Sequence, residues 1–286
     1  MHEIAFTKMH GSGNHFVLLD NRSLRVPVPD MARWAEAICA QGFGVGADGL
    51  IFLDAAPAGS DADYMWHFYN ADGSRAEMCG NGSRCAARLA MELGLAGPEH
   101  VLLTDAGPIR ALVDPDSDQV KVQLTKPRDL ALDVALTLEG QRLTVHFVNT
   151  GVPHTVVECG DVAGVDVKQL GRALRFHERF APAGTNVNFI SVTDRNALSL
   201  RTYERGVEDE TYACGTGAAA SALVAHALGL AGTAAAVTTS GGEVLRIFLE
   251  NGTVHLQGPA VTVYSGRLRA ASVGLDLPAG AAGTDA

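Results

Sequence analysis

Basic residues are scarce in this sequence, and no Lys/Arg run is present. The 286 residues include 22 Lys and Arg against 32 Asp and Glu, which gives a formal net charge of -10. This balance argues against nucleic acid or an anionic membrane as a partner, because both require basic side chains that neutralise phosphates. No apolar stretch approaches the roughly 20 residues that span a bilayer, and the N-terminus lacks the features of a signal peptide. We therefore expect a cytoplasmic protein without membrane or nucleic-acid partners.

Residues that hold common metals and cofactors are also few. No Cys-x-x-Cys or His-x-x-x-His pair is present, so we expect no zinc site. The glycine-rich run 42–49 lacks a Gly-Lys-Ser/Thr ending, which argues against a nucleotide-binding loop. Of the four lysines, Lys121, Lys126 and Lys168 lie in charged segments expected to be exposed, and Lys8 precedes a glycine turn. These settings argue against a pyridoxal Schiff base, and we expect neither metal nor cofactor.

The five cysteines do not resemble a disulfide framework, because their number is odd and the chain is long. Cys39 and Cys159 lie among apolar neighbours and Cys85 falls inside a predicted helix, so we expect all three to be ordinary buried side chains. The other two, Cys79 and Cys214, each begin a glycine turn. Thiol chemistry is therefore expected at these two positions.

The segments that begin at Cys79 and Cys214 are two copies of one pattern, in which Cys-Gly-x-Gly leads into a short predicted helix. Aligned without a gap, they agree at Cys79/Cys214, Gly80/Gly215, Gly82/Gly217, Ala87/Ala222, Ala90/Ala225, Leu93/Leu228 and Gly94/Gly229. A single copy is more often a glycine turn with an incidental cysteine, but recurrence at matched positions favours a function. A thiol at a helix N-terminus meets unpaired N–H groups and the positive end of the helix dipole, and both favour the thiolate.

A second similarity extends the repeat to most of the chain. The segment 13–20 matches the segment 151–158 at an offset of 138 residues, close to the 135 that separate the two cysteines. We therefore predict two similar halves that meet near Lys126-Pro127-Arg128. The first, residues 1–127, is expected to be completed by a C-terminal strand and tail of about 261–286, and the second spans 128–260. Residues 278–286 contain too few large apolar side chains to pack, so we predict a disordered tail.

Secondary structure follows from the apolar pattern and the turn residues. Strands are predicted at 2–8, 14–20, 64–69, 101–104, 109–113, 120–124, 244–250 and 253–257. The first two strands are joined by a glycine turn at 11–13, and the last two by Asn251-Gly252, a strong hairpin signal. Asp30 is predicted to cap one helix, and a second helix is predicted near 166–175.

Two thiols on opposite sides of a cleft suit the inversion of a stereocentre. One thiolate removes a proton from a carbon, and the other thiol returns a proton to the opposite face. The backbone N–H groups of Gly80, Asn81, Gly215 and Thr216 would hold the neighbouring α-carboxylate, where negative charge grows. A helix terminus contributes roughly 0.3 to 2 kcal/mol, about one pKa unit, which helps to form a thiolate. Carboxylate binding, exclusion of water and fixed geometry must supply most of the catalysis.

The motifs of this sequence resemble those of the diaminopimelate epimerase family over nearly the full chain. They are Lys8-Met-His-Gly-Ser-Gly-Asn-His-Phe16, Gly44-Val-Gly-Ala-Asp-Gly49, Asn70-Ala-Asp-Gly-Ser74, Met78-Cys-Gly-Asn-Gly82, Val152-Pro-His154, Thr185-Asn-Val-Asn-Phe189, Tyr203-Glu-Arg-Gly206 and Ala213-Cys-Gly-Thr-Gly217. The resemblance implies a cofactor-independent epimerase of lysine and cell-wall precursor synthesis that interconverts LL- and meso-diaminopimelate, with Cys79 and Cys214 as the acid/base pair. It also implies a homodimer with an α+β fold. In that fold two pseudo-symmetric α/β domains, each a mostly antiparallel sheet around a central helix, flank the active-site cleft.

The same resemblance assigns residues to the substrate. It implies that the reacting carboxylate binds at Gly80, Asn81, Gly215 and Thr216, that the substrate is contacted by Asn14, Asn70, Asn186, Glu204 and Arg205, and that catalysis is supported by His154 and Glu204. Arg205 suits a carboxylate through its forked donors, and Glu204 suits an ammonium. Taken singly, a Glu-Arg pair is usually exposed surface and an Asn before a turn is usually structural, so these assignments depend on the motifs.

Three positions depart from the family pattern. Val152 stands where the family often has asparagine, His15 where an acidic residue is common, and Gly49 where some members have glutamine. These departures concern recognition of the distal end of the substrate. Two alternatives stay open: a related two-cysteine racemase that acts on proline, hydroxyproline or another amino acid, and a non-catalytic protein that binds carboxylates or senses redox state through its thiols.

Overall fold

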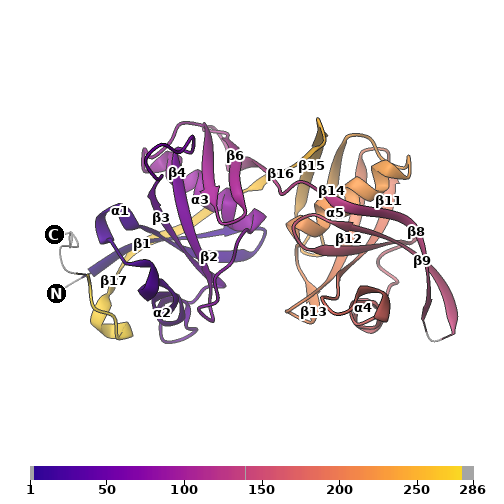
Figure 1. Ribbon diagram of the computed structural model, residues 1–286, viewed down its shortest axis with the longest axis horizontal. Helices are drawn as coiled ribbons and strands as arrows, with labels where there is room; N and C mark the ends of the chain where they lie inside the picture. Colours follow the sequence, from indigo (N-terminus) through magenta and orange to yellow (C-terminus); the bar gives the residue numbers. More distant parts are fainter. Residues whose placement is uncertain (1–2, 139, 279–286) are drawn as a thin grey trace. The chain divides into compact units, whose positions relative to one another are not determined.

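The computed structural model describes residues 3–138 and 140–278. These divide into two compact units (Figure 1): unit 1 comprises residues 3–122 and 259–278, and unit 2 comprises residues 123–138 and 140–258. The boundaries predicted from the sequence lie at 127/128 and near 260. Most of the predicted tail, from residue 279 onward, lies outside the described residues.

Unit 1 is a mixed sheet with three α-helices and one short 3-10 helix among its described residues. In chain order its elements are β1 (Glu3–Gly11), β2 (Asn14–Asp20), α1 (Asn21–Leu24), α2 (Val28–Cys39), β3 (Gly49–Ala55), β4 (Tyr64–Asn70), α3 (Gly80–Glu92), β5 (Glu99–Thr104), β6 (Gly107–Val113), β7 (Gln119–Gln123), β17 (Val261–Arg269) and η2 (Ala270–Val273). The strands pair in the order β17-β1-β2-β3-β4-β5-β6-β7. Only β2/β3 and β4/β5 are parallel among these pairs, and each is bridged by a helical crossover.

Unit 2 repeats this arrangement. Its elements are β8 (Arg128–Leu138), β9 (Gln141–Asn149), β10 (Pro153–Glu158), α4 (Val167–Arg175), η1 (Glu178–Phe180), β11 (Asn186–Asp194), β12 (Ala197–Glu204), β13 (Asp209–Thr211), α5 (Gly215–Ala227), β14 (Ala234–Thr238), β15 (Val244–Glu250) and β16 (Thr253–Pro259). The strands pair in the order β8-β9-β10-β11-β12-β14-β15-β16, and β13 adds beside β12. The parallel pairs β10/β11 and β12/β14 fall at the places that β2/β3 and β4/β5 occupy in unit 1. The predicted fold class of two pseudo-symmetric α/β halves, each a mostly antiparallel sheet, is confirmed.

A buried helix lies inside each unit and begins at a repeated cysteine. Every residue from Gly80 to Ala90 of α3 is buried, and α5 buries most of its residues. The helix α3 contacts β1, β2, β3 and β6, and α5 contacts β9, β10, β11, β12, β14 and β15 (Figure 1). A helix that is buried all round belongs to the core. The alanines and glycines of these helices allow the surrounding strands to approach closely.

Two arginines fix α3 within unit 1. Arg84 is fully buried and donates to the Ser12 hydroxyl at 2.8 Å and to the Pro259 carbonyl at 3.2 Å. Arg88 donates to the carbonyls of Asp114 at 3.0 Å and Gln119 at 3.4 Å. Buried guanidinium groups need such acceptors to offset the loss of water. These contacts hold the helix, and hence Cys79 at its N-terminus, in a fixed position within unit 1.

Several local predictions can be compared with the structure. Both hairpin turns have the left-handed backbone that a two-residue turn requires, with φ of 51° at Asn251 and 59° at Ser12, and the following glycines also have positive φ. Asp30 is not the cap of α2, because the helix already begins at Val28 after Pro27 and Asp30 lies in its first turn. The N-cap is Pro27, whose ring fixes its backbone angle, and the helix therefore begins three residues earlier than predicted.

Burial was predicted for Cys39, Cys85 and Cys159, and the structure buries the first two. Cys39 and Cys85 are 2% and 0% exposed, as expected for core residues. Burial raises the pKa of each of these thiols to about 12. Cys159 is only half-buried, because it follows the end of β10, where the sheet gives way to a loop.

Candidate active site

Cys79 is the N-cap residue of α3 and is half-buried. Its backbone is extended, with φ of −147° and ψ of 120°, so the side chain turns back over the first helical turn. There Sγ accepts a hydrogen bond from the Gly82 backbone N–H at 3.4 Å. The thiol also donates to Oδ1 of Asn14, the first residue of β2, at 3.7 Å. The structure thus brings two of the predicted site residues, Cys79 and Asn14, into contact.

Asn14 is held by Asp48, a residue that the sequence did not single out. The Asn14 amide donates from Nδ2 to Asp48 Oδ2 at 2.7 Å, and the His15 backbone N–H donates to the same oxygen at 2.9 Å. The His15 ring also approaches the carboxylate, with Nε2 3.7 Å from Asp48 Oδ1. Because a carboxylate only accepts, it turns the Asn14 oxygen toward Cys79. In the sequence, a role for Asp48 was indicated only by its position within the glycine-rich motif.

Lys8 differs from its expected setting. The sequence showed only that Lys8 precedes a glycine turn. In the structure its side chain is 8% exposed, and Nζ donates to His15 Nδ1 at 3.1 Å and to the Gly46 carbonyl. Burial lowers the pKa of Lys8, while Asp48 raises it. The ammonium therefore tethers the glycine-rich segment to β1 and positions the His15 ring beside Asp48.

The remaining predicted site residues of unit 1 lie in two places, the first turn of α3 and the end of β4. Gly80 and Asn81 form the first turn of α3, and Asn81 is 6% exposed. Among the described residues the Asn81 Oδ1 atom has no hydrogen-bond partner. Asn70 is the exposed last residue of β4, opposite Gly49, and donates from Nδ2 to the Ser74 hydroxyl at 2.9 Å.

Cys214 is the N-cap residue of α5 and is 7% exposed. Its Sγ lies 3.5 Å from the hydroxyl of Thr216, which can donate to a thiolate or accept from a thiol. The Thr216 carbonyl in turn accepts from the Thr150 hydroxyl at 3.1 Å. Gly215 and Thr216 thus place the first turn of α5 beside the thiol, as Gly80 and Asn81 do in unit 1.

Three further predicted residues lie around the ends of β11 and β12. Asn186 Oδ1 accepts from the Arg205 backbone N–H at 2.8 Å, and Asn186 Nδ2 donates to the Pro153 carbonyl at 3.2 Å. The Arg205 guanidinium donates to the Ala183 carbonyl at 3.2 Å. Glu204 is half-buried and accepts from the Thr211 hydroxyl at 2.9 Å. Burial raises the pKa of Glu204, and the Thr211 bond partly opposes that rise.

His154 is fully buried beside Asn188, a residue that the sequence did not assign. Burial, reinforced by the charge of Arg205, lowers the pKa of His154 to about 3, so the ring is neutral near neutral pH. Its Nδ1 lies 3.0 Å from Asn188 Nδ2. Asn188 belongs to the Thr185–Phe189 motif, from which only Asn186 had been assigned to the substrate. The motif was therefore visible in the sequence, but the direction of each side chain was not.

Strand registers establish which positions of the two units are equivalent. Phe16 pairs with Gly49 as His154 pairs with Asn186, and Gly49 lies opposite Asn70. Gly49 and Asn70 therefore correspond to Asn186 and Glu204. By the same offset Val152 corresponds to Asn14. The departures at Val152 and Gly49 thus fall at two sites where one unit carries an asparagine and the other does not.

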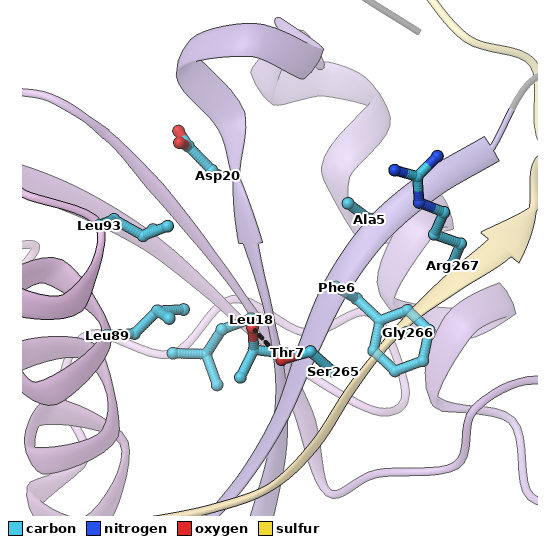
Figure 2. A pocket seen from close by; sticks show the side chains of 10 residues that line it. All are labelled: Ala5, Phe6, Thr7, Leu18, Asp20, Leu89, Leu93, Ser265, Gly266 and Arg267. Atoms are coloured by element: carbon cyan, nitrogen blue, oxygen red, sulfur yellow. Dashed lines mark hydrogen bonds between the residues drawn. The ribbon is translucent and has the colours of Figure 1, made fainter. Parts of the chain in front are cut away.

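The hollows of the described residues include two that contain no predicted site residue. One, of about 400 Å³, lies between β1, β2, β17 and the C-terminal half of α3 (Figure 2). Leu89 and Leu93 form one side of it and Arg267 lies at another, while Thr7 and Ser265 share a hydrogen bond of 3.3 Å across β1 and β17. The other, of about 230 Å³, lies in unit 2 and includes Phe180. Both are distinct from the cysteine turns.

Residues 3–138 and 140–278 contain no group of three or more His, Cys, Asp or Glu side chains placed to hold a metal ion. In the same residues no helix is both long enough and apolar enough to cross a membrane.

Comparison with known proteins identifies relatives of this chain. The model of the family described as diaminopimelate epimerase matches residues 6–130 and 146–266. A diaminopimelate epimerase of Aquifex aeolicus is 47% identical over 272 residues, covering 92% of this chain and 97% of the relative. One from Hydrogenobaculum sp. is 45% identical over 274 residues with the same coverage, and one from Archaeoglobus fulgidus is 41% identical over 285 residues, covering 96% of this chain and 99% of the relative.

Solved structures show the same fold at lower sequence identity. A hydroxyproline epimerase from Agrobacterium vitis is 17% identical with a TM-score of 0.70, covering 98% of this chain and 99% of that chain. A probable proline racemase from Agrobacterium radiobacter is 18% identical with a TM-score of 0.69, covering 93% of each chain. These two likenesses concern the fold.

Proposed function

Since the chain belongs to the diaminopimelate epimerase family, we propose that it is an isomerase that interconverts LL- and meso-diaminopimelate. The observation that carries the proposal is the combination of a family match over most of the chain with relatives of that activity at 41 to 47% identity. Both isomers are intermediates for lysine and cell-wall precursor synthesis, which is the metabolic role we assign.

The proposed reaction uses Cys79 and Cys214 as two bases. The thiolate of one cysteine takes the Cα proton, the Cα–H bond breaks, and its electron pair stays on carbon. The thiol of the other cysteine then gives its proton to the opposite face, so the two residues exchange protonation states and nothing is oxidised or reduced. Each cysteine caps a buried helix, and this placement supports a thiolate through the helix dipole and the unpaired first-turn N–H groups.

The first turns of α3 and α5 are proposed to bind the reacting amino-acid end. The N–H groups of Gly80, Asn81, Gly215 and Thr216 are suited to the α-carboxylate, because the first N–H groups of a helix have no partner within it. Negative charge accumulates on that carboxylate as the proton leaves, so these donors stabilise the transition state more than the bound substrate. The unpaired Asn81 Oδ1 supports a role as acceptor for the α-ammonium.

Asn14, Asn70, Asn186, Glu204 and Arg205 are proposed to contact the substrate, several of them at its distal amino-acid end, and Glu204 is also proposed to support catalysis. Glu204 is half-buried near Arg205 and has its pKa raised, which is an energetic cost that a bound ammonium would relieve. The Arg205 fork suits the distal carboxylate. His154 is proposed to support catalysis as a neutral donor, because its low pKa keeps it uncharged.

The protein is also proposed to act as a cytoplasmic homodimer, as the family resemblance of its sequence implies. Light scattering of the purified protein should return the mass of two chains. The mass of a single chain over the concentration range of the activity assay would contradict the dimer.

The experiment that tests the function is conversion of pure LL-diaminopimelate by reduced protein without added cofactor. We expect the meso isomer to form until the two isomers reach equilibrium. Separation of the isomers on a chiral column measures their amounts over time. L-Proline and trans-4-hydroxy-L-proline serve as parallel substrates. Conversion of either of these, with none of diaminopimelate, would reject the substrate assignment and retain the two-base chemistry.

A further inference from the structure

Equivalent positions of the two units differ in polarity below the cysteine turns. In unit 1 the positions are Phe16, Ile51 and Phe68, from β2, β3 and β4, and they are between 0% and 4% exposed. The corresponding positions in unit 2 are His154, Asn188 and Thr202, from β10, β11 and β12, and these are between 0% and 2% exposed. We call the first set the apolar trio and the second the polar triad.

Hydrogen bonds fix the orientation of Asn188 within the polar triad. Its Oδ1 accepts from the Thr202 hydroxyl at 3.0 Å. Its Nδ2 lies 3.2 Å from the Thr155 carbonyl and 3.0 Å from His154 Nδ1. A carbonyl oxygen only accepts, so the amide nitrogen must face Thr155 and the amide oxygen must face Thr202. The second N–H of Nδ2 is therefore a donor directed at His154 Nδ1.

This orientation determines where the His154 proton resides. A ring nitrogen that accepts from an amide N–H carries no proton, so the neutral ring has its proton on Nε2. Arg205 is the charged group that acts on this ring, and it disfavours the imidazolium further. Within the described chain Nε2 has no hydrogen-bond partner, although the ring is 0% exposed. A buried N–H of this kind is costly unless a ligand or water accepts from it.

The polar triad is also joined to the Cys214 turn. A Cβ built on Gly217 would overlap Asn188 Oδ1 and would lie 3.2 Å from Cys214 Sγ. Asn188 therefore packs directly under the first turn of α5, close to the thiol. In unit 1 a Cβ built on Gly82, the equivalent glycine, would lie 3.3 Å from Ile51 Cδ1. The two cysteine turns thus rest on equivalent residues, one apolar and one polar.

Packing alone does not account for the polar triad. The apolar trio fills the equivalent space in unit 1, where the Phe16 and Phe68 rings meet edge to face at 5.8 Å. Apolar side chains gain from burial, whereas buried amide and hydroxyl groups only recover the hydrogen bonds they lose to water. A role in the chemistry of the Cys214 half of the site gives a reason for the difference.

From this asymmetry we infer that Asn188 is a positioning residue of the Cys214 half-site, which holds His154 as the neutral imidazole with Nε2–H available to an acceptor that the substrate or a bound water brings. Thr202 acts through Asn188 by fixing its amide. The inference rests on the proposed function for its role in epimerisation, but the assignment of the proton does not depend on it.

Nitrogen-15 NMR of protein labelled at histidine tests the assignment directly, because it reports which ring nitrogen carries the proton. The His154 signals are identified by their loss in His154→Gln. We expect the Nε2–H form throughout the range of about pH 5 to 8 in which an ordinary histidine titrates. A proton on Nδ1, or titration within that range, would overturn the inference.

Asn188→Asp tests the role in the reaction. An aspartate carboxylate can only accept, so the His154 proton should move to Nδ1 and kcat/KM should fall by about 10- to 100-fold, the size of effect expected when a group near the reacting atoms is misplaced. Thr193→Val, which removes an exposed hydroxyl from the same strand, is the matched control and should retain full activity. Full activity in Asn188→Asp would contradict the role.

A second variant separates function from folding. The triple substitution His154→Phe, Asn188→Ile and Thr202→Phe gives unit 2 the side chains of the apolar trio. We expect it to retain the circular dichroism of the wild type and to lose epimerisation, whereas an active variant would show that the polar triad is a packing feature. If the wild type does not epimerise diaminopimelate, the proposed function fails, while the NMR result for wild type and Asn188→Asp still decides the proton assignment.

Discussion

Single residues determine the surroundings of each cysteine turn. Cys79 donates to Asn14 and accepts from the Gly82 backbone, whereas Cys214 lies beside the Thr216 hydroxyl. Asp48 orients Asn14 as Asn188 orients His154. In unit 1 the thiol is thus paired with a side chain whose own direction is set by a further group, the exposed Asp48 carboxylate. Such support is what keeps a reacting group within the narrow range of productive geometry.

The first prediction concerns the two cysteines. Cys79→Ala and Cys214→Ala should each abolish epimerisation, because either change removes one of the two groups that must exchange the proton. Folding should be preserved, since one sulfur atom is lost at a helix start. Activity is measured by chiral chromatography and folding by circular dichroism. Cys159→Ala, at a half-buried cysteine that follows the end of β10, is the control and should remain active. Full activity in either site variant would exclude the two-base mechanism.

The second prediction concerns Glu204. Burial raises its pKa above the ordinary value of 4.5, so the folded state binds its proton more tightly than the unfolded state. The resulting stability is present below pH 4.5 and is lost as pH rises through the folded pKa. Glu204→Gln should therefore unfold at higher urea concentration than the wild type at pH 7, with a smaller difference near pH 4.

The same variant should lose activity while it gains stability. A charge-assisted bond to an ammonium is worth roughly 1.5 to 3 kcal/mol, which corresponds to about a 10- to 100-fold loss in kcat/KM. Glu204→Gln with wild-type kcat/KM for diaminopimelate would contradict a contact with the distal ammonium. Glu250→Gln, at the exposed end of β15, is the control for a change of charge.

Much of the site was visible in the sequence, but the supporting residues were not. The repeat located Cys79 and Cys214 because a cysteine before Gly-x-Gly is recognisable without structure. Lys8 and Asp48 were missed because they lie 40 residues apart and their contact with His15 depends on how β1 meets the glycine-rich segment. Asn188 was missed because a strand alternates its side chains, and only the pairing with β10 shows that this asparagine faces His154.

At the scale of elements, the candidate site residues of each unit lie where a helix begins, one strand begins and another strand ends. The helices α3 and α5 start at the cysteines, and β4 and β12 end at Asn70 and Glu204. The strands around them follow one order of pairing in both units, with the parallel pairs at equivalent places. Local patterns predicted most strands, since apolar alternation and turn residues are encoded nearby. The start of α2 was not predicted correctly, because Pro27 outweighs the capping tendency of Asp30.

The third prediction compares the two glycines of the helix starts. Gly217→Ala should destabilise the protein by about 1 to 3 kcal/mol, because the new methyl group overlaps Asn188, which three hydrogen bonds hold in place. Gly82→Ala should be nearly neutral, because its methyl group would lie 3.3 Å from the flexible end of Ile51 and alanine favours a helix. Urea unfolding measures both. Equal stability of the two variants would contradict the packing described for Asn188.

At the scale of the whole molecule, two copies of one fold have diverged in complementary ways. Unit 1 supplies asparagine at positions 14 and 70, where unit 2 has Val152 and Glu204, and unit 2 supplies Asn186 where unit 1 has Gly49. The cysteine turns are retained in both. Duplication thus provides a cysteine at each helix start, and we propose that the diverged side chains distinguish the reacting end of the bound substrate from its distal end. The duplication was evident from the offsets of 138 and 135 residues, whereas the exchange of asparagines required the strand registers.

The most direct test of the two-base account is one turnover of LL-diaminopimelate in deuterium oxide by the reduced wild-type protein. The thiol that donates has exchanged with solvent and therefore carries deuterium, while the other cysteine removes the substrate hydrogen. We predict that the first meso product formed carries deuterium at the inverted carbon and that unreacted LL substrate does not. Meso product that retains the original hydrogen would show that a single base returns the proton it removed, and would contradict the account.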